Sequence, residues 1–191
     1  QTWLHPASDS APYSGDTKAL FPWTLAKAYL SSPAALAESI KQRRAKLDQH
    51  VPAQRAELKA LNTLDELNQE ALTEQAGKFA ALVKRLKHIG VGKGSETRAV
   101  VFAERIATLT WLRNHLPAAL GLKDENVAML HGGLSDVEQQ ELVDSFKLET
   151  SPIRVLVTGD VASEGVNLHA QCHHLIHYAI PWSLIRIEQR N

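Results

Sequence analysis

The chain has 191 residues, 44% hydrophobic and 22% charged, and its 21 basic and 21 acidic side chains cancel to a net charge of zero. This length fits one domain, or one domain with an appendage, and it can bury a hydrophobic core without disulfide bonds or structural metals. Neutrality argues against a small basic nucleic-acid-binding protein, and the single cysteine excludes an intramolecular disulfide and fits a reducing environment.

No apolar run is long enough to cross a bilayer and no signal peptide opens the sequence, so we expect a cytoplasmic protein without membrane contact. The charge is nevertheless uneven. Residues 1–95 carry 13 basic and 9 acidic side chains (+4), whereas residues 96–191 carry 8 and 12 (−4), which indicates two unlike halves. Because the chain begins with glutamine rather than methionine, we expect it to be a piece of a longer protein.

The first half opens with a segment that lacks periodicity. Residues 1–17 are rich in Ser, Pro, Asp and Gly and predict a linker or extended segment. Residues 18–30 have a helical pattern that includes Trp23, for which we expect core packing. Ser32 and Pro33 predict the start of a second helix, because serine caps free backbone N–H groups and proline fits the first helical position.

The helical pattern continues over residues 52–89, where leucines recur at intervals of three and four. Thr63 and Glu66 form a predicted capping box, at which we expect one helix to end and another to begin. The glycine-rich residues 90–95 predict a flexible joint. The expected organisation is therefore an all-helical segment over residues 18–95.

After that joint the pattern changes to strands that alternate with helices. Strands are predicted at residues 98–103, 126–130, 153–157 and 173–180, and helices at 106–120, at 136–148 behind a Ser135 cap, and from Ser183 onward. Such alternation implies parallel βαβ units with right-handed crossovers. We therefore predict a three-layer α/β domain over residues 96–191. Trp111, inside the first of these helices, is expected to pack in the core.

Residues 90–95 look like a phosphate-binding loop but lack its spacing. The pattern G-x-x-x-x-G-K-[ST] needs Ser or Thr after the lysine, and Lys93 is followed by Gly94. The segment also precedes a predicted strand, so no helix N-terminus is expected there to hold phosphate. A linker is the expected role.

The richest candidate region begins where the third predicted strand ends. Thr158, Gly159 and Asp160 leave that strand, and a loop of small residues then carries Gly165 and Asn167. In open parallel sheets, ligands bind beyond the carboxyl ends of the strands, where this loop must lie. Composition alone leaves a structural turn and a ligand-binding loop equally open.

The second half resembles the C-terminal RecA-like lobe of superfamily 2 helicases and translocases. RAVVFAERIATLTWLRNHL is similar to motif IV, MLHGGLSDVEQQELVDSF to the block that follows it, RVLVTGDVASEGVNL to motif V, and the run from Pro181-Trp182 to Glu188-Gln189-Arg190-Asn191 to the start of motif VI. The E-G-x-N-L form is close to that of the Swi/Snf-like branch. In the first half, FPWTLAKAYLSSPAALAESI is similar to a helical element between the two lobes of bacterial members.

The resemblance implies positions for two ligands. ATP binds such motors between two RecA-like lobes, and this chain looks like the second lobe alone. The nucleotide would lie near four residues: Gly165, Asn167, Gln189 and Arg190. The nucleic-acid backbone would be contacted by five residues: His131, Gly132, Gly133, Thr158 and Gly159.

The resemblance also implies which parts of the motor lie elsewhere. Lobe one of the family carries the phosphate loop and the Mg²⁺-binding acid, and the arginine finger comes later in motif VI than Asn191. We therefore expect no catalytic residue in this chain, no ATP or Mg²⁺ bound to it alone, and no ATP hydrolysis by it alone. The expected whole is an ATP-dependent DNA helicase or translocase, with duplex DNA and the N-terminal lobe as partners of this chain.

A second hypothesis is a non-catalytic nucleic-acid-binding or protein-binding module that keeps the lobe fold. The sequence before Gln1 and after Asn191 would distinguish the two, because an intact motor has a phosphate loop upstream and a completed motif VI downstream. A dinucleotide enzyme is disfavoured, since no G-x-G-x-x-G follows the first predicted strand.

Two further patterns have ordinary explanations. His169, Cys172, His173, His174 and His177 suggest zinc, but side chains alternate along a strand and do not converge on a tetrahedral site, so no metal is expected. A Cys172–His173 nucleophilic pair fails for the same reason. The basic residues are expected to form solvated helix faces, with phosphate contact as the alternative; they are Lys41, Arg43, Arg44, Lys46, Arg55, Lys59, Lys78, Lys84, Arg85, Lys87 and Lys93.

Overall fold

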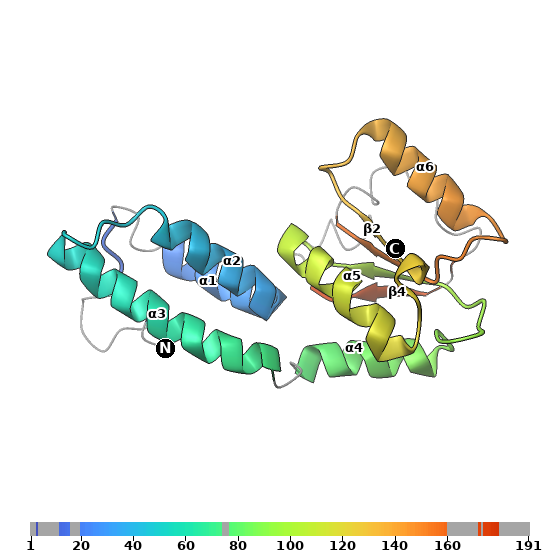
Figure 1. The fold of residues 1–191 in the computed structure, drawn as a ribbon, viewed down its shortest axis with the longest axis horizontal. Helices are drawn as coiled ribbons and strands as arrows, with labels where there is room; N and C mark the ends of the chain where they lie inside the picture. The colour runs from blue at the N-terminus through green and yellow to red at the C-terminus, as the bar shows by residue number, and fades with distance from the viewer. Residues whose placement is uncertain are drawn as a thin grey trace. The chain divides into compact units, whose positions relative to one another are not determined.

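A computed structural model describes residue 3 and residues 12–15, 20–73, 77–159, 172 and 174–179. The chain divides into two compact units, residues 1–76 and residues 77–191 (Figure 1). The first is helical over its described residues, and the second contains a parallel sheet.

The first unit contains helices α1 (Leu20–Ser31), α2 (Pro33–Arg44) and α3 (Pro52–Thr73). Helix α2 begins as predicted: the hydroxyl of Ser32 accepts a hydrogen bond from the backbone N–H of Ala35 at 3.0 Å, and Pro33 occupies the first turn. The three helices bury a small apolar core that includes Leu25, Ala28, Leu36, Ile40 and Leu61.

Two expectations for the first unit were wrong. Helix α3 runs through the predicted restart without a break, and the hydroxyl of Thr63 donates to the carbonyl of Lys59 one turn earlier instead of capping a new helix. Trp23 is 53% exposed, because the buried side of α1 is formed by other positions, Leu25 and Ala28 among them. A capping box needs non-helical backbone at its first residue, and the leucine pattern around Thr63 keeps the backbone helical.

Within its described residues, the second unit has a sheet of four parallel strands in the order β2-β3-β1-β4. The strands are β1 (Ala99–Phe102), β2 (Val127–Leu130), β3 (Val155–Thr158) and β4 (Leu175–His177). The helices are α4 (Gly77–His88), α5 (Ile106–Leu120) and α6 (Asp136–Lys147), with a short 3₁₀ turn at Asp124–Asn126. The α/β class and the parallel sheet predicted from the sequence are confirmed.

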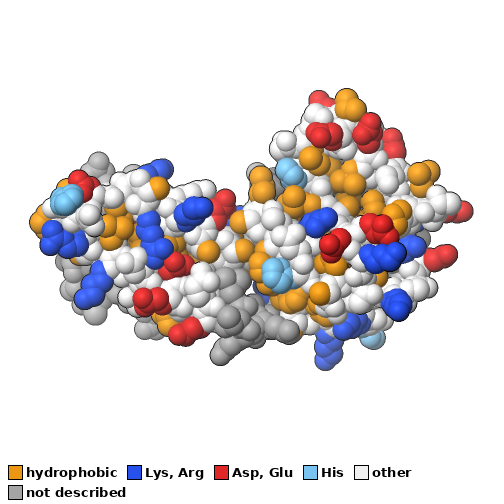
Figure 2. All heavy atoms as spheres, in the orientation of Figure 1, with side chains coloured by type: hydrophobic (Ala, Val, Ile, Leu, Met, Phe, Trp, Pro, Cys, Tyr) orange, Lys and Arg blue, Asp and Glu red, His pale blue; other side chains and the backbone are white. Residues whose placement is uncertain are grey.

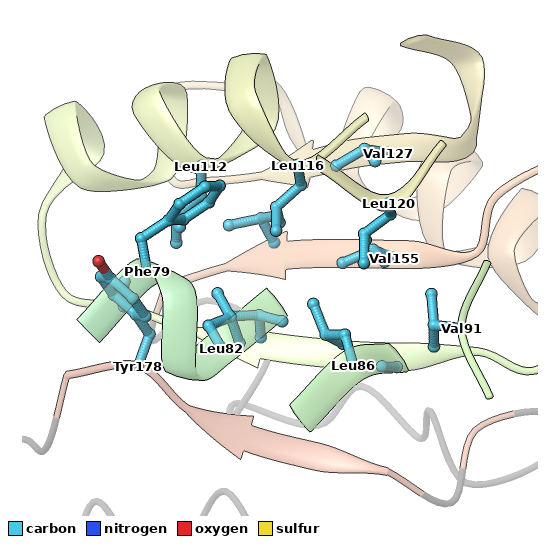
Figure 3. Packing of buried hydrophobic residues seen from close by; sticks show 14 of the residues in the cluster. Phe79, Leu82, Leu86, Val91, Leu112, Leu116, Leu120, Val127, Val155 and Tyr178 are labelled. Atoms are coloured by element: carbon cyan, nitrogen blue, oxygen red, sulfur yellow. The ribbon is translucent and has the colours of Figure 1, made fainter. Parts of the chain in front are cut away.

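Alternating side chains of the strands fill two separate layers of core. Val101 and Val155 contact α4 and α5 on one face, where Leu82, Leu86, Leu112 and Leu116 converge (Figure 3). Val100 and Leu156 point to the other face, where they pack with Val143 and Phe146 of α6. Successive strand residues point to opposite faces, so each strand contributes to both layers. The described part of the unit is thus a three-layer sandwich.

The second unit begins at Gly77, whereas the sequence places a domain boundary between residues 95 and 96. Helix α4 accounts for the difference, because Phe79, Leu82 and Leu86 are buried in the cluster that covers β1 and β3. Its apolar face has the same helical spacing as the helices before it, and that spacing does not specify which neighbour the face meets.

The remaining expectations for exposed and buried side chains have different outcomes. Trp111 packs partly buried against the core, with its ring 4.8 Å from that of Phe79, as predicted. Arg43 and Arg44 are not simply solvated, because they pair with Glu57 and Asp65. Over the residues that the structure describes, no helix is both long enough and apolar enough to span a membrane.

Candidate functional site

The candidate site lies at the carboxyl edge of the sheet. Leu130 of β2 stands beside Thr158 of β3, which stands beside Phe102 of β1, so parallel strands end together at this edge. The residues that follow, His131 after β2 and Gly159 after β3, therefore emerge from neighbouring strands. The fold brings together the two groups of residues that the sequence singled out for nucleic-acid contact.

The His131–Gly133 turn is held by the histidine ring itself. The backbone N–H of Gly133 donates to Nδ1 of His131 at 3.1 Å, and the carbonyl of His131 accepts from the backbone N–H of Leu134 at 3.1 Å. With Nδ1 as acceptor, the neutral ring carries its proton on Nε2, which remains a donor. Gly132 and Gly133 are exposed, so their backbone is open to solvent.

Directly after this turn, α6 begins with a reciprocal cap. The hydroxyl of Ser135 accepts from the backbone N–H of Glu138 at 3.3 Å, and the carboxylate of Glu138 accepts from both the N–H and the hydroxyl of Ser135 at 2.8 Å. These hydrogen bonds from Ser135 lower the pKa of Glu138. The Ser135 cap is thus as predicted, and it fixes the end of the turn against the helix.

The surface of α6 is mainly acidic. Figure 2 shows red side chains gathered over the region where α6 lies in Figure 1. The helix carries four acids and one lysine: Asp136, Glu138, Glu141, Asp144 and Lys147. An anionic ligand is repelled along α6, so favourable contact with one is restricted to the turn and the strand ends.

Thr158 and Gly159 are both buried at the end of β3. The hydroxyl of Thr158 is 3.3 Å from the carbonyl oxygen of Gly159, to which it donates. A Cβ on Gly159 would lie 3.6 Å from the carbonyl oxygen of Ala103, which is ordinary contact, so the glycine is not required by local packing. In the described structure the Thr158 side chain is turned inward.

The end of β1 adds residues that the sequence did not select. Glu104 and Arg105 follow β1 at the same edge, and Arg105 is the N-cap residue of α5. The Arg105 side chain makes no capping hydrogen bond within the described structure, in contrast to that of Ser135 at the start of α6. The dipole of α5 places partial positive charge at this end of the helix, which favours a negatively charged group nearby. Their signal in the sequence was the strand-to-helix junction without Ser, Thr, Asp or Asn at its cap.

At the end of β4 lies Tyr178, a second residue that the sequence pattern does not single out. Tyr178 is buried at 4% exposure, and its hydroxyl has no hydrogen-bond partner among the described residues. Burial raises the pKa of Tyr178 to about 12. The ammonium of Lys78 lies 4.3 Å from the centre of the Tyr178 ring, and burial lowers the pKa of Lys78. Because Lys78 belongs to the first turn of α4, the start of the unit is fixed against the end of β4.

The four residues predicted to lie near the nucleotide, Gly165, Asn167, Gln189 and Arg190, fall outside the described residues. His169 and His173 of the histidine cluster do too, whereas Cys172, His174 and His177 are described. No group of three or more metal-ligand side chains occurs within the described part of the chain. What the described edge offers chemically is the exposed backbone of Gly132 and Gly133 and the positive end of the α5 dipole, which suit an anion.

Comparison with known proteins identifies relatives of the second unit. The helicase conserved C-terminal domain family matches residues 77–191. A Bacillus subtilis (strain 168) protein named "Uncharacterized ATP-dependent helicase YqhH" is 27% identical over 127 residues, covering 66% of this chain and 20% of that protein. The chain therefore spans about a fifth of that relative's length.

Two solved structures share the fold. The Hef helicase domain of Pyrococcus furiosus superposes with a TM-score of 0.64 at 19% identity, over 90% of this chain and 36% of that one. The C-terminal part of the Fun30 ATPase domain superposes with a TM-score of 0.52 at 18% identity, over 93% and 67%. At these identities the likeness concerns the fold, and it agrees with the three-layer lobe described above.

Proposed function

Because the chain belongs to the helicase conserved C-terminal domain family, as its resemblance to superfamily 2 helicases predicted, we propose that it is the second motor lobe of an ATP-dependent DNA translocase. The observation that carries this proposal is the junction of β2 and β3, where His131–Gly133 and Gly159 leave adjacent strand ends at the edge where α5 also begins. Backbone N–H groups and a helix N-terminus on one edge suit successive phosphates of a nucleic-acid strand.

In this proposal the strand is gripped by its backbone and not by its bases. Gly132 and Gly133 are exposed, and glycine lets a phosphate approach the main chain closely. Thr158 is buried and its hydroxyl donates to the carbonyl of Gly159, so the exposed contacts in this proposal are those of the His131–Gly133 turn. Such contacts position a protein on DNA without reading sequence. We assign the chain to the Swi/Snf-like branch, with duplex DNA as its nucleic acid, because residues 164–168 have the form E-G-V-N-L.

The nucleotide is assigned to the cleft between this lobe and the N-terminal lobe of the same protein. Gly165, Asn167, Gln189 and Arg190 would line it from this side, with the phosphate loop and the Mg²⁺ ligands on the other lobe. Mg²⁺ in such motors neutralises charge on the transferred phosphate. In this proposal the chain closes on the nucleotide, and its contacts with the DNA backbone change as the cleft opens. A cytoplasmic location is part of the same proposal.

The decisive experiment supplies the missing lobe. ATP hydrolysis by the complete motor is measured with duplex DNA, single-stranded DNA, RNA and no nucleic acid, and we expect strong stimulation by duplex DNA. The 191-residue chain alone is expected to hydrolyse no ATP above buffer. Equal rates with and without every nucleic acid would favour instead a binding module that retains the lobe fold.

A glycine pair localises the effect to the site. Gly133→Ala in the complete motor should raise the DNA concentration for half-maximal stimulation about tenfold, because the methyl group displaces the His131 ring from the turn. Gly77→Ala is the matched control, since a Cβ there meets nothing within 4 Å. Equal effects of the two substitutions would remove the turn from the proposed DNA site.

A further inference from the structure

A pocket lies at the opposite, amino edge of the sheet, away from the site assigned above. Its volume is about 370 Å³, within the range of small-molecule sites. Three connections meet there: the glycine-rich residues 92–96 before β1, residues 121–126 before β2, and Arg154 before β3. Since β3 lies between β2 and β1, Arg154 stands at the centre and the two loops form the sides. Strands of four residues separate this pocket from the carboxyl edge by about 13 Å.

The walls of the pocket are tied together by hydrogen bonds. The Nε of Arg154 donates to the carbonyl of Ser95 at 2.7 Å, and its backbone N–H donates to the carbonyl of Asn126 at 2.8 Å. One residue therefore anchors both loops. Gly94 and Gly121 have φ angles of +76° and +67°, a left-handed conformation that glycine adopts at little cost. The pocket is consequently preformed by backbone geometry.

The charge around the pocket is incompletely compensated. Among the described residues, the guanidinium of Arg154 donates only to backbone carbonyls, those of Ser95, Ser151 and Ile153. Arg98, at 5% exposure, likewise donates only to the carbonyls of Phe146, Leu148 and Glu149. No ion pair joins either arginine to a carboxylate within the described residues. Burial, and after it the charge of Arg154, lowers the pKa of Arg98, as expected where positive charges face one another.

Two lysines add to this charge, and two carboxylates limit it. Lys93 and Lys123 line the pocket, the latter in a loose 3.4 Å pair with Glu125 that is largely exposed. Glu96 and Glu125 also line it, so the net charge of the lining side chains is +1, from three bases and two acids. A site of this composition has donors for an anionic group and acceptors for hydroxyl groups of the same molecule.

We propose that this pocket binds a small phosphate monoester that carries hydroxyl groups, a sugar phosphate or a nucleoside monophosphate. Lys93, Lys123 and the turn at Gly94 take the phosphate, and Glu96 and Glu125 accept hydrogen bonds from the hydroxyl groups. The volume is sufficient for a phosphorylated pentose. The site is independent of the proposed motor function and lies on the other edge of the sheet.

The test is a binding titration of the ¹⁵N-labelled 191-residue chain followed by NMR. Ribose 5-phosphate is compared with ribose, inorganic phosphate and adenosine 5′-monophosphate. We expect ribose 5-phosphate to shift the amide signals of Gly92, Gly94 and Gly121, and to bind at least tenfold more tightly than ribose or phosphate alone. Tighter binding of adenosine 5′-monophosphate than of ribose 5-phosphate would identify the ligand as a nucleoside monophosphate. The proposal would be overturned if none of the four compounds shifts these signals at concentrations up to about 10 mM. Shifts confined to other residues would overturn it as well.

Two double variants distinguish binding in the pocket from nonspecific attraction of the ligand to positive charge. Lys93→Ala/Lys123→Ala keeps every backbone hydrogen bond of the loops and should weaken ribose 5-phosphate binding about a hundredfold, about tenfold for each lost charge-assisted bond. Lys84→Ala/Lys87→Ala removes the same charge from α4 and should leave binding unchanged. Equal weakening by both pairs would overturn the proposal. Thermal unfolding of each variant verifies that it is folded.

The carboxylates supply a second readout, a change in ligand preference, that general charge attraction does not predict. Glu96→Gln/Glu125→Gln removes two negative charges, so inorganic phosphate should bind more tightly to this variant. The preference for ribose 5-phosphate over phosphate should nevertheless fall, because amides are weaker acceptors for the hydroxyl groups. An unchanged preference would contradict the assignment of the hydroxyl contacts.

Discussion

The imidazole of His131 occupies the space that a side chain on residue 133 would need. A Cβ built on Gly133 lies 2.9 Å from both Cε1 and Nδ1 of the His131 ring, closer than side-chain carbons approach other atoms. The same ring nitrogen accepts the hydrogen bond from the Gly133 N–H. The His-Gly-Gly sequence is therefore one structural unit, in which the histidine ring requires the glycine two residues later.

Gly133→Ala should lower the free energy of unfolding by about 1 kcal/mol, because the displaced ring no longer accepts from the backbone N–H. The backbone at Gly133 is not in the left-handed region, so the ring is the source of the cost. On a His131→Ala background the same substitution should cost close to nothing. Urea unfolding of the four proteins of this cycle gives the coupling energy, and a coupling near zero would refute the link between the two residues.

Glu57→Gln should destabilise the first unit by about 3 kcal/mol, because it breaks a buried ion pair. Glu57 is fully buried, and its carboxylate accepts from Arg43 at 2.7 and 3.0 Å and from the Ser14 hydroxyl and N–H at 2.6 and 2.9 Å. Asp65→Asn is the matched control. Its pair with Arg44 is partly exposed and contributes less than about 1 kcal/mol.

The same network predicts how the stability of the first unit depends on pH. Burial alone raises the pKa of Glu57, but the hydrogen bonds from Arg43 and Ser14 outweigh it, and the net shift from 4.5 is downward. A carboxyl with a lowered pKa in the folded state stabilises above its ordinary pKa and loses that contribution as the pH falls through the lowered value. Stability should therefore decline below about pH 4.5 in the wild type, and less steeply in Glu57→Gln.

Ser135→Ala should cost about 1 kcal/mol of stability in the second unit, since it removes the acceptor for the Glu138 N–H at the start of α6. Ser145→Ala, in the last turn of the same helix, is the control and should be neutral or slightly stabilising because alanine favours helices. Guanidinium unfolding of both variants distinguishes them. Equal effects would show that the cap contributes no more than an ordinary serine.

Tyr178→Phe should leave the second unit as stable or stabilise it by up to about 1 kcal/mol, because the hydroxyl it removes is buried without a partner among the described residues. The exposed Tyr29 provides the control substitution, which should change stability by less than about 0.5 kcal/mol. In an ultraviolet titration, the difference between wild type and Tyr178→Phe should show a tyrosine that ionises near pH 12. Ionisation near pH 10 would mean that the ring is open to water.

Features encoded within a few residues could be predicted from the sequence. Ser32 and Ser135 are good caps because a short side chain there reaches the N–H three residues later, and both act as caps in the structure. The three longer strands are β-branched or apolar runs between helical patterns, and each was located to within two residues. The His131–Gly133 and Thr158–Gly159 segments could be selected because each follows such a strand.

Other features depend on residues far apart in the chain. Glu57 reaches Ser14 across 43 positions, and Arg154 reaches Ser95 across 59, and no local pattern marks either contact. For this reason the sequence pattern of α2 predicts a solvated basic face, although Arg43 contacts both the Glu57 carboxylate and the Tyr13 ring. That the start of α5 lies beside the end of β3 follows only from the pairing of β1 with β3.

The sequence by itself determined the alternation of strands and helices in the second half, because strand and helix periodicities and caps act over a few neighbouring residues. It also determined which segments leave the strands at the carboxyl edge. Tertiary structure alone decided that α4 packs on the sheet, since an apolar helix face does not specify its partner. It also decided that the glycine-rich joint, which lacks a phosphate-loop spacing, forms one wall of a pocket, because the other walls come from the segments before β2 and β3.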